Sequence, residues 1–393
     1  MKKSGAITFG APRISREDIR EVLATLRSGW LGTGPRTAEF ESRFSGYMGG
    51  RGAVAVSSGT AALHLALMAS GIRPGDEVIT TPLTFAATAN AIIAAGAVPR
   101  FADVDRDTQN ISVECASRAV TRRTRAIIPV HLAGRPCDMD GLLALARKKR
   151  LTVIEDASHA IEALYHGRHA GTIGDFGCFS FTPNKNITTG DGGVVMVKRA
   201  RDARKIRMYA GQGMSANAWQ RMGGGRKAPD YRIMMPGFKY AMTDLNASIG
   251  LNQLGRIEKW WRRRLAIWIY YGHHFTGLPV FLPTAEVPGG RHALHLYTVH
   301  LDLDRLNRGR DEVRRMLAGM GIGTGIHYMS LHLHPYYRRR FGFASSAFPN
   351  AEWISRRTLS LPLSPHLSLA EAGWVADSLR KVLLACSRSG GRK

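Results

Sequence analysis

The 393-residue chain contains only four cysteines, Cys115, Cys137, Cys178 and Cys386, and no CxxC pair. So few cysteines in a chain of this length exclude a disulfide framework and indicate reducing surroundings. Long apolar runs are also missing: the strongest one in the C-terminal half, 265–271, is far shorter than the roughly 20 residues of a membrane span. No apolar run follows Lys2 and Lys3, so no signal peptide is predicted. We therefore expect a soluble cytoplasmic protein.

Acidic residues are scarce relative to basic ones. Asp and Glu number 30 against 55 Lys and Arg, which gives a formal net charge of +25. Such a charge suggests a nucleic-acid partner. The arginines are spread along the chain, however, as at 199–207 and 310–315, and no helix-turn-helix, zinc-finger or RRM signature is present. We expect nucleic acid not to be the partner, although one anionic substrate does not account for the whole charge.

What the chain does contain is an alternation of short apolar runs with stretches of helical spacing. Strands are predicted at 53–56, 77–80, 98–102, 126–131, 151–154, 176–181 and 194–197. Helices are predicted at 16–26, 60–69, 88–95 and 140–149. The strands are nearly continuous runs of Val, Ile and Ala, which is typical of strands buried on both faces. The order of elements predicts an α/β fold with a mostly parallel sheet.

The pattern changes after residue 197. A basic helix is predicted at 199–207, a Gly-rich loop at 211–229 and a single helix at 244–264. From about residue 292 the texture is α+β, with a strand at 296–301, a helix at 310–320 and a strand after 325. We therefore divide the chain into a large cofactor-binding domain, 1–255, and a helical connection with a small α+β C-terminal domain, 256–393.

The segment 176–197, FGCFSFTPNKNITTGDGGVVMV, holds the first candidate for chemistry. A strand that carries Ser180 runs into the turn TPNKN, which presents Lys185. The glycines that follow let the chain turn back into another strand, because such turns often require positive φ or close backbone approach. A lysine is usually a solvated surface residue, but a lysine on a tight turn at a strand end is a candidate catalytic group.

Two further segments have polar residues at strand ends. LTVIEDASHA, 151–160, ends its apolar run in Glu155 and Asp156, at the edge where ligands bind in open α/β sheets. Such a carboxylate is either a helix cap or a ligand partner. AVAVSSGTAALHLAL, 53–67, reads as strand, turn and helix, and the free N–H groups of the helix start can hold a phosphate. Its Ser and Thr residues could equally be plain N-caps.

The three segments together match the parts of one ligand, pyridoxal phosphate. Its phosphate would bind at 58–60 and at Ser180. Its pyridine nitrogen would face Asp156, and its aldehyde would react with Lys185. The sequence thus predicts a cofactor-dependent enzyme.

Many motifs of the chain occur in an order that resembles the DegT/DnrJ/StrS family of sugar aminotransferases, from about residue 7 to about residue 384. The matching pieces are SGWLGTGP at 28–35, SSGTAALHLAL at 57–67, TPLTFAATANAI at 81–92, FADVDRDT at 101–108, IIPVHLAG at 127–134, VIEDASHA at 153–160, FSFTPNKNITTGDGG at 179–193, PGFKYAMTDLNASIGLNQL at 236–254, GIGTGIHY at 321–328 and LSLPLSPHLS at 359–368. A set of this kind is far more specific than any single glycine pattern.

The resemblance implies a fold type I architecture and a role for each matching residue. Lys185 matches the Schiff-base lysine and Asp156 the partner of the pyridinium nitrogen. The implied cofactor-binding residues are Gly59, Thr60 and Ser180 at the phosphate, Phe85 and His159 at the ring, and Asp156 and Lys185. The implied substrate-binding residues are Thr33, His327 and Tyr328. No metal site is predicted, since His332 and His334 lack the Cys or HExxH pattern that would support one.

The resemblance also implies a homodimer with shared active sites, because 236–241 matches a segment that reaches toward the neighbouring subunit's cofactor. Family members commonly have Asn at the first or third of positions 239–241, where this chain has Lys239-Tyr240-Ala241. This departure leaves the cross-subunit phosphate contact open. It also leaves an alternative in which the protein is a family-shaped regulator or binding protein without turnover.

The implied reaction passes an amino group from glutamate, which becomes 2-oxoglutarate, to a nucleotide-linked keto-sugar in polysaccharide or lipopolysaccharide biosynthesis. Lys185 favours transamination over a family branch that carries histidine there and catalyses dehydration. The C-terminal stretches GIGTGIHY, HPYYRRRF and NAEWISRRTLSLPL are most similar to the UDP-4-amino-4-deoxy-L-arabinose–oxoglutarate aminotransferases, which favours a UDP-4-keto sugar. A 3-keto dTDP sugar remains the alternative acceptor.

The basic and aromatic stretch KWWRRR at 259–264 has two interpretations. A helix that packs its apolar face on the sheet is the ordinary one. Peripheral contact with an anionic membrane is the alternative, because adjacent tryptophans beside arginines are typical of interfacial helices.

Overall fold

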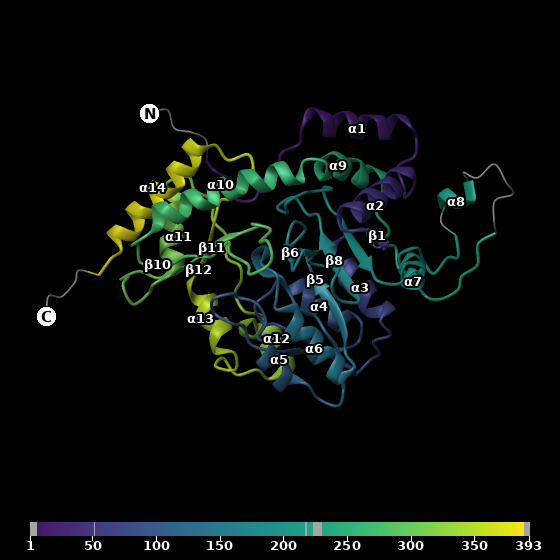
Figure 1. Cartoon of the computed structure of the whole chain (residues 1–393), viewed down its shortest axis with the longest axis horizontal. Helices are drawn as coiled ribbons and strands as arrows, with labels where there is room; N and C mark the ends of the chain where they lie inside the picture. The colour runs from purple at the N-terminus through teal and green to yellow at the C-terminus, as the bar shows by residue number, and fades with distance from the viewer. Residues whose placement is uncertain (1–5, 51, 217, 223–229, 389–393) are drawn as a thin grey trace.

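The computed structural model describes residues 6–50, 52–216, 218–222 and 230–388. Its centre is a seven-stranded sheet (Figure 1). In spatial order the strands are β1 (Gly52–Val56), β9 (Gly193–Val197), β8 (Phe176–Ser180), β5 (Thr152–Asp156), β4 (Thr124–Ile127), β2 (Glu77–Thr80) and β3 (Val98–Phe101). Strand β9 runs opposite to the other six strands, which are parallel to one another. The predicted α/β fold with a mostly parallel sheet is confirmed.

Alternating side chains of the strands bury both faces of this sheet. In β1, Val54 and Val56 join the apolar cluster under α3 (Gly59–Ala69) and α7 (Ala200–Ala210). Ala53 and Ala55 point to the opposite cluster, which contains aromatic residues of α2 (Pro35–Tyr47). This period of two is what a strand between two helical layers requires.

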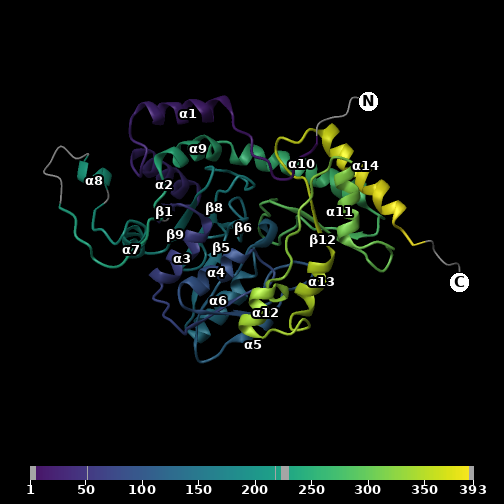
Figure 2. The same ribbon diagram turned by 180° about the vertical axis from the view of Figure 1, so that it is seen from behind.

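The remaining helices of the large sheet complete those layers. They are α4 (Ala86–Ala94), α5 (Val113–Ala119), α6 (Met139–Lys149), the short 3-10 helix η1 (Leu132–Gly134), α1 (Arg16–Arg27) and α9 (Asp244–Leu254). Figures 1 and 2 show α1, α2 and α9 grouped at one end of the sheet, where α9 contacts both other helices. A two-stranded hairpin, β6 (Leu164–Tyr165) and β7 (Arg168–His169), lies apart from the main sheet.

Three expectations about the second half need correction. The predicted helix 244–264 is two helices, α9 and α10 (Ile257–Phe275), separated at 255–256. The strand expected after 325 is only an isolated bridge between Gly325 and Ser360. The loop predicted at 211–229 contains a short helix, α8 (Ala218–Met222), and its part at 223–229 lies outside the described residues.

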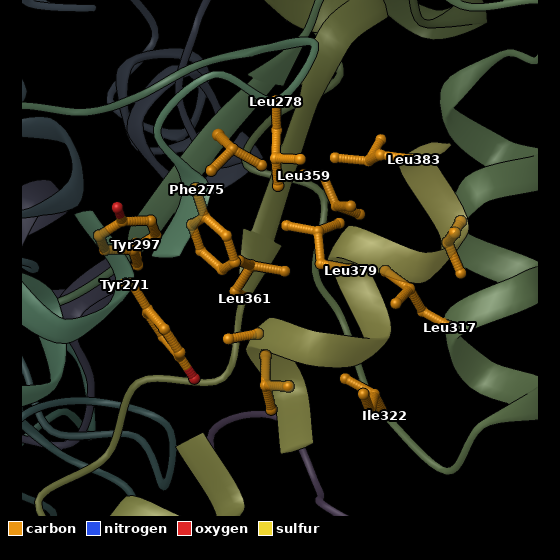
Figure 3. Close-up of a cluster of buried hydrophobic side chains, with 14 of the residues drawn as sticks. Tyr271, Phe275, Leu278, Tyr297, Leu317, Ile322, Leu359, Leu361, Leu379 and Leu383 are labelled. Atoms are coloured by element: carbon orange, nitrogen blue, oxygen red, sulfur yellow. The ribbon is translucent and has the colours of Figure 1, made fainter. Parts of the chain in front are cut away.

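The C-terminal part has its own sheet and core, as its α+β texture predicts. Strands β10 (Val280–Phe281), β11 (Tyr297–Leu301) and β12 (Thr358–Leu361) pair antiparallel. Figure 3 shows side chains of β11 and β12 meeting those of α10, α11 (Arg310–Gly319) and α14 (Leu369–Ala385). The remaining elements are η2 (Leu331–Leu333), α12 (Pro335–Phe341) and α13 (Pro349–Arg357). They share an apolar cluster with Leu83 and Leu132, which follow strands β2 and β4 of the large sheet. The division at residue 255 stays a prediction.

Helix α10 decides between the two interpretations of the stretch at 259–264. Trp260 is 8% exposed within the apolar cluster of the large sheet. Trp261 is half-buried, and its indole N–H donates to the carbonyl of His292 at 2.8 Å. Both tryptophans are therefore used inside the protein, which removes the observation behind the membrane alternative. No helix in the described part of the chain is long and apolar enough to cross a membrane.

Candidate active site

The predicted segments meet at one edge of the large sheet. Strands β5 and β8 are parallel neighbours that end at Asp156 and Ser180. Strand β1 is antiparallel to β9, which is antiparallel to β8, so β1 also ends at this edge and leads into α3. This is the edge where open α/β sheets bind ligands.

The start of α3 forms a seat for an anion. Ser58 is its N-cap, and the hydroxyl accepts from the N–H of Ala61 at 3.1 Å. Among the described residues, the N–H groups of Gly59 and Thr60 have no hydrogen-bond partner. A Cβ on Gly59 would lie 2.7 Å from the Cβ of Ser180, so only glycine lets the helix start lie this close to β8. Free donors at a helix start beside a serine fit a phosphate group.

Asp156 is held in one orientation at the end of β5. Its side chain is 5% exposed. Oδ2 accepts from the Thr88 hydroxyl at 2.8 Å, and Oδ1 accepts from the Ser158 hydroxyl at 2.6 Å. A buried carboxylate fixed by two hydroxyl groups fits a protonated ring nitrogen. Thr88 was not predicted as a site residue, because it lies 68 positions away in the sequence.

Lys185 is presented by its turn as predicted. Its backbone N–H donates to the carbonyl of Thr182 at 3.0 Å, and its side chain is half-buried. Desolvation lowers the pKa of the amine from 10.5 to about 8, while the charge of Asp156 acts in the opposite direction. Desolvation disfavours the charged form of an amine. Lys185 is therefore much more often a neutral nucleophile near pH 8 than an ordinary lysine is.

His159 and Tyr328 form a pair whose proton positions follow from their partners. The Nδ1 atom of His159 accepts from the N–H of Ala133 at 3.3 Å. Burial, followed by the charge of Lys185, holds the His159 pKa well below its ordinary value, so the ring is neutral. Its single proton is then on Nε2 and is donated to the Tyr328 hydroxyl oxygen at 3.2 Å. The Tyr328 proton is left free to point at another acceptor.

The other predicted residues fall into two groups. Phe85 is 62% exposed, with its ring centroid 6.1 Å from that of Tyr328, and the Nδ1 atom of His327 is 2.7 Å from the Ser360 hydroxyl. Burial, followed by the charge of Lys185, lowers the His327 pKa to about 4, so His327 also lies near the site. Thr33 is engaged elsewhere: its hydroxyl donates to the carbonyl of Met242 at 2.7 Å. The role of Thr33 in substrate binding stays a prediction.

A buried polar chain behind Lys185 was missed by sequence reasoning. Arg264 pairs with Glu162, whose other oxygen accepts from the Asn186 amide at 2.6 Å. The Asn186 oxygen is 2.9 Å from Nδ1 of His295, so this nitrogen carries the proton and donates. His295 is neutral because burial, followed by the charge of Lys185, lowers its pKa well below the ordinary value. Its Nε2 is buried without a partner among the described residues.

One signal in the sequence could have revealed this network of buried polar side chains. Glu162 stands inside the apolar run AIEAL, and a carboxylate in a buried run needs a positive partner. The partner could not be read from the sequence, because Arg264 lies 102 positions away.

The segment at 239–241, where the chain departs from the family pattern, contacts the turn before α3 through its backbone. The carbonyl of Tyr240 accepts from the N–H of Ser57 at 2.7 Å, which ties this segment to the turn before α3. The Lys239 side chain is exposed. His332 and His334 approach backbone carbonyls, and no cluster of metal ligands occurs in the described part of the chain.

The parts present fit pyridoxal phosphate: a seat for an anion, a fixed carboxylate and an amine of lowered pKa. Comparison with known proteins agrees, since the profile of the DegT/DnrJ/EryC1/StrS aminotransferase family matches residues 12–380. The chain belongs to this family. It is a pyridoxal phosphate-dependent sugar aminotransferase.

Individual relatives cover nearly the whole chain. The spore coat polysaccharide biosynthesis protein SpsC of Bacillus subtilis is 43% identical, over 97% of this chain and 98% of its own length. Spr1654 of Streptococcus pneumoniae, assigned as a sugar aminotransferase, matches in its PLP form with a TM-score of 0.89 and 32% identity, over 97% and 99% of the two chains. PseC of Helicobacter pylori, an aminotransferase, matches with a TM-score of 0.89 and 25% identity, over 97% and 100%.

Proposed function

We propose that this enzyme moves an amino group from glutamate to a nucleotide-linked keto-sugar, with a UDP-4-keto sugar as the acceptor. The observation that carries the transfer reaction is the lowered pKa of Lys185 beside the fixed carboxylate of Asp156. The nature of the acceptor is supported by the relatives, because SpsC serves polysaccharide biosynthesis and PseC the biosynthesis of pseudaminic acid. The C-terminal motifs favour the UDP-4-keto sugar over a 3-keto dTDP sugar.

When bound, pyridoxal phosphate supplies the electron sink for the transfer. Gly59, Thr60 and Ser180 would hold its phosphate, and Asp156 would keep its ring nitrogen protonated. The amine of Lys185 would act as general base and afterwards as general acid, because its Nζ could take the proton from the donor's Cα and later return it. A pKa near 8 suits both steps near neutral pH.

Tyr328, His327 and Phe85 form the wall that would meet the sugar. Because His159 donates to the Tyr328 oxygen, the Tyr328 proton is available for a hydroxyl or carbonyl oxygen of the substrate. Phe85 offers an exposed ring at the start of α4. We include Thr33 in the substrate site on the resemblance alone. We place the enzyme in the cytoplasm because its few cysteines indicate reducing surroundings.

The proposal includes a homodimer. Residues 211–216 and 230–240 form an arm that carries α8 and extends away from the body of the molecule (Figure 1). Apolar side chains on this arm are exposed: Trp219, Met222, Tyr231, Ile233 and Met234. Exposed apolar groups gathered on one projecting segment are typical of a protein–protein contact, and a second copy of the chain would cover them.

The visible absorption spectrum of the purified protein tests this function. Protein incubated with pyridoxal phosphate is expected to show a visible band, which glutamate bleaches and a UDP-4-keto sugar restores. Lys185→Ala should lack the band, whereas Lys198→Ala, which removes an exposed lysine just beyond β9, should keep it. A protein without the band, or with a band that glutamate leaves unchanged, would support the alternative of a binding protein without turnover.

A further inference from the structure

Two hollows lie side by side near Lys185. The inner one is a cavity lined by Lys185 and His295, and the second one lies on the surface. It is lined by the start of α10, by the segment before α1 and by the turn before α14. We name it the α10 cleft and define it by Arg13, Arg256, Lys259, Arg262, Arg263 and His366. Five cationic side chains thus gather at one hollow next to Lys185.

The α10 cleft has little negative charge to balance these cations. No Asp or Glu occurs among its described lining residues. Arg256 is neutralised by Asp18, but Arg13, Lys259 and Arg262 have no ion-pair partner in the described part of the chain. The surrounding charge is felt by His366, whose pKa is lowered by burial and then by four arginines, among them Arg13 and Arg256.

The α10 cleft adjoins the cavity that Lys185 lines. Arg13, Trp260 and His366 line both the cleft and the inner cavity that contains Lys185 and His295. The inner cavity also lacks Asp and Glu among its described lining residues. A ligand can therefore place a reacting carbon at Lys185 and an anionic group outside, among Lys259 and Arg262.

We propose that the α10 cleft binds the diphosphate of the nucleotide-linked sugar, an inference that rests on the proposed function. A glutamate molecule is too short to fill both hollows, because its carboxylates must lie close to the reacting Cα. In a nucleotide-sugar the sugar ring separates the reacting carbon from the diphosphate, as the arrangement of the two hollows requires. Paired phosphates also suit a group of arginine and lysine side chains, which donate charge-assisted hydrogen bonds.

The test measures UDP binding to the holoenzyme by calorimetry, in wild type and in Lys259→Ala/Arg262→Ala. Both side chains are exposed, so the variant is expected to fold. The loss of two charge-assisted contacts should weaken UDP binding at least about tenfold. The matched control is Arg314→Ala/Arg315→Ala on α11, which removes the same charge from exposed positions and should leave the Kd unchanged.

Kinetics separate this inference from the proposed function. In the cleft variant, KM for the keto-sugar nucleotide should rise while the bleaching of the visible band by glutamate keeps its wild-type rate. Unchanged UDP affinity in the variant, with a normal glutamate response, would overturn the diphosphate site and leave the proposed function intact. A variant that loses affinity for 2-oxoglutarate instead of UDP would also overturn it. A protein that shows no visible band would contradict the proposed function. The measurement of UDP binding would still test the diphosphate site in that case.

Discussion

At the scale of single residues, the site depends on the balance of charge around Lys185. Burial disfavours the ammonium form, and Asp156 partly restores it, which gives a pKa of about 8. His159, His295 and His327 are all held neutral, since burial and the nearby lysine lower their pKa values. Neutral imidazoles around one amine mean that Lys185 and Asp156 carry the charge at the centre of the site.

The first prediction concerns the pH at which apoprotein takes up pyridoxal phosphate. The neutral amine is the reacting form, and a depressed pKa makes it abundant above about pH 8. The rate at which the visible band appears should therefore rise with pH, reach half its maximum near pH 8 and level off above it. Stopped-flow absorbance measures this rate. A rate that still climbs above pH 10 would show an ordinary lysine.

The second prediction concerns the buried pair of Arg264 and Glu162. Removing one partner leaves an uncompensated charge, so Arg264→Met should lower the free energy of unfolding by about 3–5 kcal/mol. The double variant Arg264→Met/Glu162→Leu removes both charges and should regain most of that loss. Urea unfolding of the three proteins measures both effects. A double variant no more stable than Arg264→Met would mean that the unpaired charge of Glu162 is not what destabilises the single variant.

The residues that could be predicted from the sequence share one property: each lies in a short motif at a strand end. Gly59, Asp156, Ser180 and Lys185 are placed by the local rule that parallel strands end at one edge. The buried polar network of Arg264, Glu162, Asn186 and His295 could not be predicted. Its members come from four segments, and only packing brings them together. Side-chain burial, which sets the pKa of Lys185, is likewise a property of the folded chain.

At the scale of elements, α2 shows how one helix is capped by another. Its own N-cap is Gly34, which has no side chain to accept a hydrogen bond. The carboxylate of Asp244, in the first turn of α9, accepts instead from the N–H groups of Gly34 and Thr37 at 2.8 and 2.9 Å, and from the Thr37 hydroxyl at 2.7 Å. This contact fixes α2 to α9 over one face of the sheet.

The third prediction follows from that contact. Asp244→Ala leaves several buried donors without an acceptor and should lower the free energy of unfolding by about 2–4 kcal/mol. Thr37→Val removes only the hydroxyl and should cost about 1 kcal/mol. Urea unfolding compares the two variants. If both cost the same, the carboxylate is not the cap of α2.

Element boundaries divide into those that local patterns predict and those that they do not. The central strands appear within a few residues of their predicted positions, because continuous apolar runs are visible in the sequence. The end of α9 at Leu254 was missed, since Gly255 and Arg256 interrupt an otherwise helical pattern without a proline. Helix α9 packs on α2, whereas most of α10 packs in the C-terminal core, so tertiary contacts rather than local preference separate them.

At the scale of the whole molecule, the arm that carries α8 has exposed apolar side chains that a single copy of the chain does not cover. Most of the molecule's large apolar side chains are inside its clusters. On the arm, Met222 is 78% exposed, Ile233 62% and Met234 59%. The same arm continues into Tyr240, whose carbonyl binds the turn before the phosphate seat. A contact that covers the arm would therefore also steady the start of α3.

The last prediction joins assembly to cofactor binding through this arm. Ile233→Asp places a charge on the apolar surface that we assign to the dimer contact, so sedimentation should show a shift from dimer toward monomer. Because the arm is tied to Ser57, the same variant should bind pyridoxal phosphate more weakly, which titration of the visible band measures. The matched control is Ile269→Asp, at an isoleucine of α10 that is 50% exposed, and it should remain dimeric. If Ile233→Asp stays a dimer with full cofactor affinity, the arm is not the contact, and its exposed side chains serve another partner.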